Sequence, residues 1–141
     1  MKYFILFLVT FTCYSQDFNS ALNMHNTIRG YYDLKPLSIS DSLTSLAQER
    51  AVLSAKKDKI MFENDKLGQS GFFTDYITIS RDYFLEATIG WILENYDEAS
   101  LNQLLCEKCE SVGFGVSMSD DKVYVIAVYD KLYELNNNRL K

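Results

Sequence analysis

The chain has 141 residues and a formal net charge of −5, and 48% of its residues are hydrophobic. This length fits one domain with a sizeable core. The acidic balance argues against nucleic-acid and acidic-membrane partners, because both attract basic surfaces. One proline and six glycines are too few for a linker-rich or disordered chain.

Residues 1–15 have the pattern of a secretory signal peptide. Lys2 supplies the positive start, and residues 3–11 form an apolar run that is too short to span a bilayer. Cys13 and Ser15 are the small residues expected before a cut after Ser15; the alternative is that Cys13 carries a lipid. No other segment is apolar enough for a membrane helix. We therefore predict no transmembrane segment in the mature chain and a secreted, periplasmic or extracellular location.

Two helices are predicted in the first half of the mature chain. Residues 18–30 repeat their core-facing positions every three or four residues, and Gly30 is placed to end this helix. A second helix begins near Ser40, with Asp41 favourably placed at its positive N-terminus. This helix is expected to end in the charged run at residues 56–59, whose lysines suit a helix C-terminus.

A long irregular segment is predicted next. Residues 58–78 are expected to be mostly loop, with a short strand at residues 76–78. Residues 80–96 then predict the central helix, because their apolar side chains follow the 3.6-residue period of a buried stripe. Ser80 is placed to cap its first turn. Residues 101–105 fit either a short helix or an edge segment.

Two strands close the predicted domain. Residues 112–116 alternate in a period of two, and residues 123–129 are rich in β-branched and aromatic side chains. Turn-forming residues at 119–121 join them into a hairpin. The order of elements predicts an α+β fold with helices packed on a small, mostly antiparallel sheet. This domain covers residues 17–135, and a polar tail follows at residues 136–141.

Two cysteines remain after cleavage, Cys106 and Cys109, in a C-x-x-C arrangement. A short structural disulfide is the leading interpretation in an exported protein. A redox-active pair is a second interpretation, although the flanking sequence is not a strand leading into a helix as in thioredoxin. Half a zinc site would need further soft ligands, which one histidine and no second cysteine pair do not supply. Two free thiols remain a fourth interpretation.

Five short motifs stand in a family-like order along the chain. They are His25-Asn26-Thr27-Ile28-Arg29; Leu37, Ile39 and Leu43; Ala47 and Ala51; Trp91-Ile92-Leu93-Glu94; and Gly113-Phe114-Gly115. With them the chain resembles the CAP superfamily, or SCP domain, of cysteine-rich secretory proteins, venom antigens and plant pathogenesis-related proteins. The resemblance covers nearly the whole mature chain. It implies an α-β-α layered sandwich.

The resemblance also implies a central cleft in which two histidines and two glutamates can hold a divalent metal such as zinc. The spacing of the family motifs places these four positions at Phe62, Gln69, Glu94 and Ser100, so only Glu94 keeps the family residue. Phenylalanine has no ligand atom, and glutamine and serine are poor zinc ligands. We therefore expect a degenerate site that holds no metal or other cofactor and whose four residues line a binding cleft.

The other motif residues are expected to be structural. These are His25, Asn26, Arg29 and Trp91. His25 is the only histidine and could serve as a base or ligand. The resemblance instead favours local bonding that locks the first helix to the sheet.

The sequence thus favours a secreted CAP-like protein that is not an enzyme and binds an extracellular ligand or a protein partner. The resemblance implies that a lipid or sterol-like ligand is one option. A hydrolase that uses Glu94 in the family cleft is an alternative, although acid–base catalysis usually needs a second titratable group. A structural or interaction module, recognisable by a large exposed apolar patch, is another.

Overall fold

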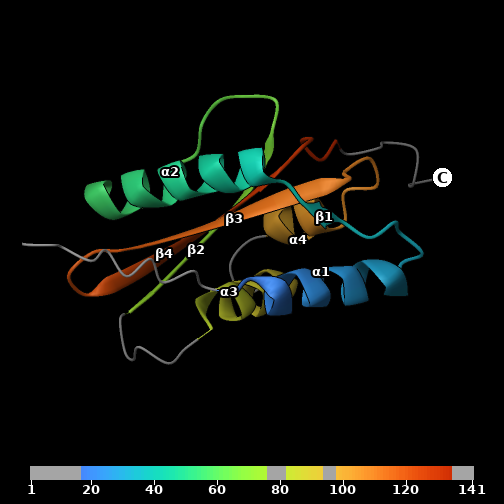
Figure 1. The fold of residues 1–141 in the computed structure, drawn as a ribbon, viewed down its shortest axis with the longest axis horizontal. Helices are drawn as coiled ribbons and strands as arrows, with labels where there is room; N and C mark the ends of the chain where they lie inside the picture. The colour runs from blue at the N-terminus through green and yellow to red at the C-terminus, as the bar shows by residue number, and fades with distance from the viewer. Residues whose placement is uncertain (1–16, 76–81, 94–97, 135–141) are drawn as a thin grey trace, which may run out of the picture.

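The computed structural model describes residues 17–75, 82–93 and 98–134. The elements are α1 (Asn19–Tyr31), β1 (Ser38–Ile39), α2 (Asp41–Lys57), β2 (Gly68–Asp75), α3 (Tyr83–Ile92), α4 (Glu98–Leu104), β3 (Ser111–Met118) and β4 (Lys122–Tyr129). The sheet lies between α2 on one face and α1 and α3 on the other (Figure 1). The predicted α+β fold with its α-β-α layers is confirmed. The predicted signal peptide and polar tail lie outside the described residues.

The sheet has the strand order β1-β3-β4-β2. β1 runs parallel to β3, and the other two pairings are antiparallel. The predicted hairpin is therefore confirmed as β3–β4, with residues 119–121 at its turn. β2 pairs with β4 over its whole length of eight residues.

The two faces of the sheet have separate cores. The side chains between α2 and the sheet are Leu43, Ala47, Ala51, Ile126 and Val128. A larger aromatic core on the opposite face includes Tyr83, Phe84, Trp91, Phe114 and Tyr129. Apolar burial on both faces removes β4 from water, as expected for a central strand.

The prediction that residues 58–78 are mostly loop is wrong, because β2 occupies Gly68–Asp75. Small and polar residues such as Gly68 and Ser70 take its inward-facing positions, and Phe72 alone on that face is a buried hydrophobe. The strand therefore lacks the apolar alternation that identifies strands in a sequence. Pairing with β4 specifies it instead. The strand predicted at residues 76–78 lies outside the described residues.

The predicted start of α2 is confirmed, and the predicted end of α1 is wrong. Ser40 caps α2 by accepting a hydrogen bond from the amide of Leu43 at 3.4 Å. Gly30 lies inside α1, which continues to Tyr31. The left-handed conformation follows later, at Asp33, with a φ of 57°. Aspartate tolerates this conformation better than most residues, so no glycine is needed there.

The central helix is shorter than predicted. The side chain of Asp82 caps α3 by accepting a hydrogen bond from the amide of Leu85 at 3.0 Å. The helix ends at Ile92, and Leu93 is its C-terminal cap. The predicted cap Ser80 lies outside the described residues. Of the two options for residues 101–105, the helix is the one observed, as α4.

Candidate functional site

His25 lies fully buried between α1 and the sheet. Its Nδ1 is 2.9 Å from the carbonyl oxygen of Ala21, and its Nε2 is 2.9 Å from the hydroxyl of Tyr129. A carbonyl can only accept, so Nδ1 carries the proton and Nε2 accepts from the tyrosine. Burial lowers the pKa of His25 from 6.5 to about 4, because it disfavours the charged form. A neutral ring with both nitrogens engaged supports a structural role.

Asn26 fixes the chain that enters β1. Its Nδ2 donates to the carbonyl of Leu37 at 3.0 Å, and its Oδ1 accepts from the amide of the same residue at 2.7 Å. The side chain thus pairs with a backbone as a neighbouring strand would. This pairing positions the segment that runs from α1 into the parallel strand.

Arg29 is fully buried. It links three segments of the chain: the connector after α1, the end of α4 and the loop that contains the two cysteines. Its Nε donates to the carbonyl of Lys35 at 2.8 Å. Its Nη1 donates to the carbonyls of Leu104 and Cys106 at 2.8 and 2.9 Å. Its Nη2 donates to the carbonyl of Cys109 at 3.2 Å. The partners that the structure gives this guanidinium within the described residues are thus backbone carbonyls.

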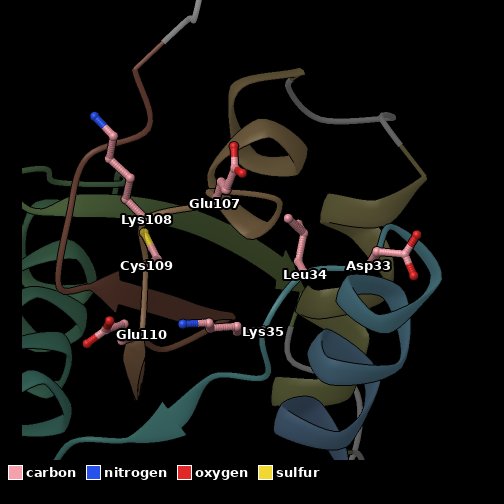
Figure 2. Close-up of a pocket in the computed structure, with 7 residues that line it drawn as sticks. All are labelled: Asp33, Leu34, Lys35, Glu107, Lys108, Cys109 and Glu110. Carbon is pink, nitrogen blue, oxygen red and sulfur yellow. The ribbon is translucent and has the colours of Figure 1, made fainter.

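Cys106 and Cys109 are joined in a disulfide, with their Cα atoms 5.4 Å apart. A bonded pair fits both the structural-disulfide and the redox-active interpretations, and it fits neither the zinc site nor the free thiols. A cavity of about 330 Å³ opens beside it, between the α1–β1 connector and the cysteine loop (Figure 2). The lining residues are Asp33, Leu34, Lys35, Glu107, Lys108, Cys109 and Glu110.

Trp91 connects α3 to β2. Its side chain is fully buried, and its indole N–H donates to the carbonyl of Gly71 at 3.0 Å. A buried tryptophan is expected to find such a partner. The predicted structural residue therefore reaches the same strand that carries Gln69.

Phe62 lies over β2. A side-chain carbon at Gly71 would come 3.1 Å from the Phe62 ring and 2.5 Å from Ile60. Phe73 lies on the same face of the strand, two residues on, and stacks on Tyr124 with ring centroids 6.2 Å apart. Phe62 and Phe73 are 50% and 49% exposed. We call Phe62, Phe73 and Tyr124 the aromatic strip.

Gln69, the second residue of β2, bonds the loop that precedes this strand. Its Oε1 accepts from the amide of Glu63 at 3.0 Å, and its Nε2 donates to the carbonyl of Glu63 at 2.7 Å. An ion pair between the buried Arg50 and Asp65 ties the same loop to α2. Together these contacts hold the loop that carries Phe62.

Of the two remaining cleft positions, Ser100 does not join Phe62 and Gln69. Ser100 is buried in α4. α4 packs on the opposite face of β2, since a side chain at Gly68 would come 2.1 Å from Gln103. Glu94 lies outside the described residues. Within those residues, no three histidine, cysteine, aspartate or glutamate side chains lie close enough to hold a metal ion.

Sequence reasoning missed three functional or structural side chains. Phe73 had no motif, and it joins the aromatic strip only because β2 exists. Arg50 belongs to no motif, and its charged side chain is buried. Gln103 bonds the carbonyl of Lys131 and the amide of Tyr133, both at 2.8 Å. The partners of Gln103 lie far away in the sequence, so no local sequence signal could have predicted these bonds.

The profile of the cysteine-rich secretory protein family, CAP, matches residues 22–130. The chain belongs to the CAP family. Helix α3, which carries the family Trp91, and the β3–β4 hairpin both lie within the matched region. The resemblance inferred from the five motifs is therefore confirmed.

Solved structures of CAP proteins share the fold. NaASP2, solved with Zn²⁺, is 14% identical with a TM-score of 0.68, over 82% of this chain and 80% of that one. Venom allergen-like protein 4 of Schistosoma mansoni is 18% identical with a TM-score of 0.56, over 82% and 92%. The Ancylostoma-secreted protein Ac-ASP-7 is 16% identical with a TM-score of 0.62, over 88% and 75%. Identities this low establish the fold alone. The comparison with curated proteins finds no relative of this chain.

None of the helices in the described residues is long and apolar enough to cross a bilayer. The longest of them, α2, carries charged residues at both ends.

Proposed function

We propose that this chain is an exported, non-catalytic CAP domain that binds an apolar extracellular ligand on its aromatic strip. The observation that carries the proposal is Phe62. The spacing of the family motifs implies a metal-binding histidine at this position, and here a half-exposed phenylalanine lies over a glycine of β2. Export rests on the signal-peptide pattern of residues 1–15.

The neighbouring positions support the same assignment. Gln69 uses both ends of its amide on Glu63, so it is committed to shaping the loop. Phe73 extends the apolar surface along the strand, and its ring is backed by Tyr124. An exposed aromatic surface that lies over a glycine of β2 fits a flat apolar molecule, such as a sterol or another lipid, better than it fits an ion.

Zinc is expected not to bind this site. Phe62 supplies no ligand atom, and zinc sites need three or four nitrogen, sulfur or carboxylate ligands. A native mass spectrum of the mature chain, recorded with and without added zinc, tests this directly. One zinc bound per chain would overturn the non-metal assignment and implicate Glu94 and Glu63.

Removing the two exposed rings of the aromatic strip is expected to weaken apolar ligand binding. Trp91 is the only tryptophan and donates to Gly71 directly beneath Phe62, so its fluorescence reports on this surface. Titration with dehydroergosterol should change that fluorescence. The double variant Phe62→Ser/Phe73→Ser should weaken the affinity by about tenfold or more, because it removes most of the apolar area.

The matched control removes two exposed apolar side chains elsewhere. Val52 on α2 and Leu132 after β4 are 51% and 55% exposed. Val52→Ser/Leu132→Ser should leave sterol binding unchanged. Equal losses in both double variants would mean that binding is non-specific, and no binding by the wild type would favour a protein partner.

A further inference from the structure

The loop that contains Cys106 and Cys109 has an unusual electrostatic setting. Arg29 donates to the carbonyl oxygens of both cysteines, at 2.9 and 3.2 Å. A guanidinium keeps its positive charge at any ordinary pH. A permanent cation beside a C-x-x-C pair favours the thiolate form, which is the reactive form of cysteine.

The surroundings of Cys109 also suit a reduced sulfur. The carbonyl oxygen of Lys131 lies 3.2 Å from its Sγ, and the Nε2 of Gln103 lies 3.4 Å from it. A disulfide sulfur has no proton to donate to that carbonyl, whereas a thiol does. The amide of Gln103 can donate to a thiolate. The site therefore offers a partner to each protonation state that reduction would produce.

The loop is also held by contacts that do not involve the disulfide. Arg29 binds the carbonyls of Leu104, Cys106 and Cys109. The ammonium of Lys131 donates to the carbonyl of Lys108 at 2.7 Å. Breaking the sulfur–sulfur bond would leave these bonds in place. The oxidised and reduced chains can thus share one fold.

A cavity beside the pair is the candidate entry route. Both cysteines are buried, but Cys109 lines the cavity of about 330 Å³ that Leu34 and Lys35 border on the other side (Figure 2). Its lining includes the carboxylates of Asp33, Glu107 and Glu110, which belong to exposed residues, where solvent and salt screen their charge. This volume accommodates a small organic thiol.

We propose that Cys106 and Cys109 form a redox-active pair that exchanges electrons with a small dithiol entering this pocket. A thiolate of the dithiol attacks Sγ of Cys109, the Cys106–Cys109 bond breaks, and Cys106 leaves as a thiolate. The second thiolate of the dithiol then attacks the sulfur bonded to Cys109 and releases it. Two electrons pass to the protein, its two sulfurs take up the two protons of the dithiol, and the dithiol becomes a disulfide.

Reduction of the wild-type mature chain tests the proposal without any substitution. The chain is equilibrated with dithiothreitol in native buffer, alkylated with iodoacetamide and weighed, while circular dichroism follows the fold. We expect complete reduction with the fold retained, and complete re-oxidation when oxidised dithiothreitol is supplied. Reduction that requires denaturant, or that unfolds the chain, would show a structural disulfide instead.

The reactivity of the reduced thiols gives an independent readout. The alkylation rate of the folded chain, measured against pH, should have a midpoint about one unit or more below the ordinary thiol pKa of about 8.5. Burial alone would raise this midpoint, so a lowered value reports the effect of Arg29. The same measurement in denaturant supplies the unperturbed reference. Equal or higher midpoints in the folded chain would overturn the proposal.

A pair of tryptophan substitutions tests the route. Leu34→Trp fills the pocket and should slow reduction by dithiothreitol about tenfold. Tyr31→Trp places the same side chain nearby at a position that is 87% exposed and outside the pocket lining, so its rate should equal that of the wild type. Equal rates in the two variants would show that the pocket is not the route.

Discussion

Gly115→Ala is expected to destabilise the chain by about 3 kcal/mol or more, which is the upper range for overpacking a core. A side-chain carbon at this position would come 2.3 Å from the backbone carbon of Ala47 and 2.3 Å from the backbone nitrogen of Gln48. These are backbone atoms of α2, so no rotamer change can relieve the contact. The helix would have to move off the sheet.

α2 cannot move freely, because it is pinned to β3. The Nε2 of Gln48 donates to the carbonyl of Val116 at 2.8 Å, and its Oε1 accepts from the amide of Val116 at 3.1 Å. Moving the helix breaks these two bonds and opens the core around Ala47. Since a typical domain is stable by about 5–15 kcal/mol, the loss is a large fraction of the total.

Urea unfolding followed by circular dichroism measures the effect, and Gly30→Ala is its matched control. Nothing lies within 4 Å of a side-chain carbon at Gly30, which is inside α1. Alanine forms helices more readily than glycine by about 1 kcal/mol, so this variant should be as stable as the wild type or more so. A Gly115→Ala variant of wild-type stability would contradict the close packing of α2 on β3.

These glycines illustrate what the sequence could and could not predict. Alternation in residues 112–116 predicted the strand, and the family motif identified Gly113 and Gly115 as a pair. Their physical reason, the approach of α2 to β3, depends on two segments far apart in the chain. Local periodicity carries no information about such an approach.

The candidate site shows the same limit on prediction from the sequence. Family spacing led to Phe62 and Gln69. Phe62 lies in the loop before β2, and Gln69 lies in β2 and bonds Glu63 of that loop. The spacing could not indicate that Gln69 would turn to this loop, because that depends on the backbone of Glu63. β2 itself was missed, since glycine and serine occupy its inward face. Phe73 therefore joined the site only when strand pairing was known.

Acid is expected to weaken the fold through His25, beginning above the range in which most carboxylates titrate. Burial lowers the pKa of His25 to about 4, whereas an unfolded chain binds this proton near pH 6.5. The unfolded state therefore gains the proton first as pH falls. The stabilisation is fully present above pH 6.5 and is lost progressively down to pH 4. The shift in pKa corresponds to about 3 kcal/mol of unfolding free energy.

The structure explains why protonation of His25 would lower stability. A proton on Nε2 would turn this atom from an acceptor into a donor, and the bond from the hydroxyl of Tyr129 would have to reverse. The new charge would lie beside Trp91 and Phe114, whose rings meet the imidazole nearly edge-on. The charge of Arg29 also opposes protonation. Protonation is therefore coupled to separation of α1 from the sheet.

Urea unfolding of the wild type and of His25→Gln, measured at intervals from pH 7 to pH 4, isolates this contribution. Glutamine keeps hydrogen-bonding capacity but does not titrate, so the variant should begin less stable and lose less between pH 6.5 and pH 4. Carboxylates contribute equally to both proteins and cancel in the difference. Parallel pH profiles would mean that His25 accepts its proton without cost, and that the bond between α1 and Tyr129 does not depend on a neutral imidazole.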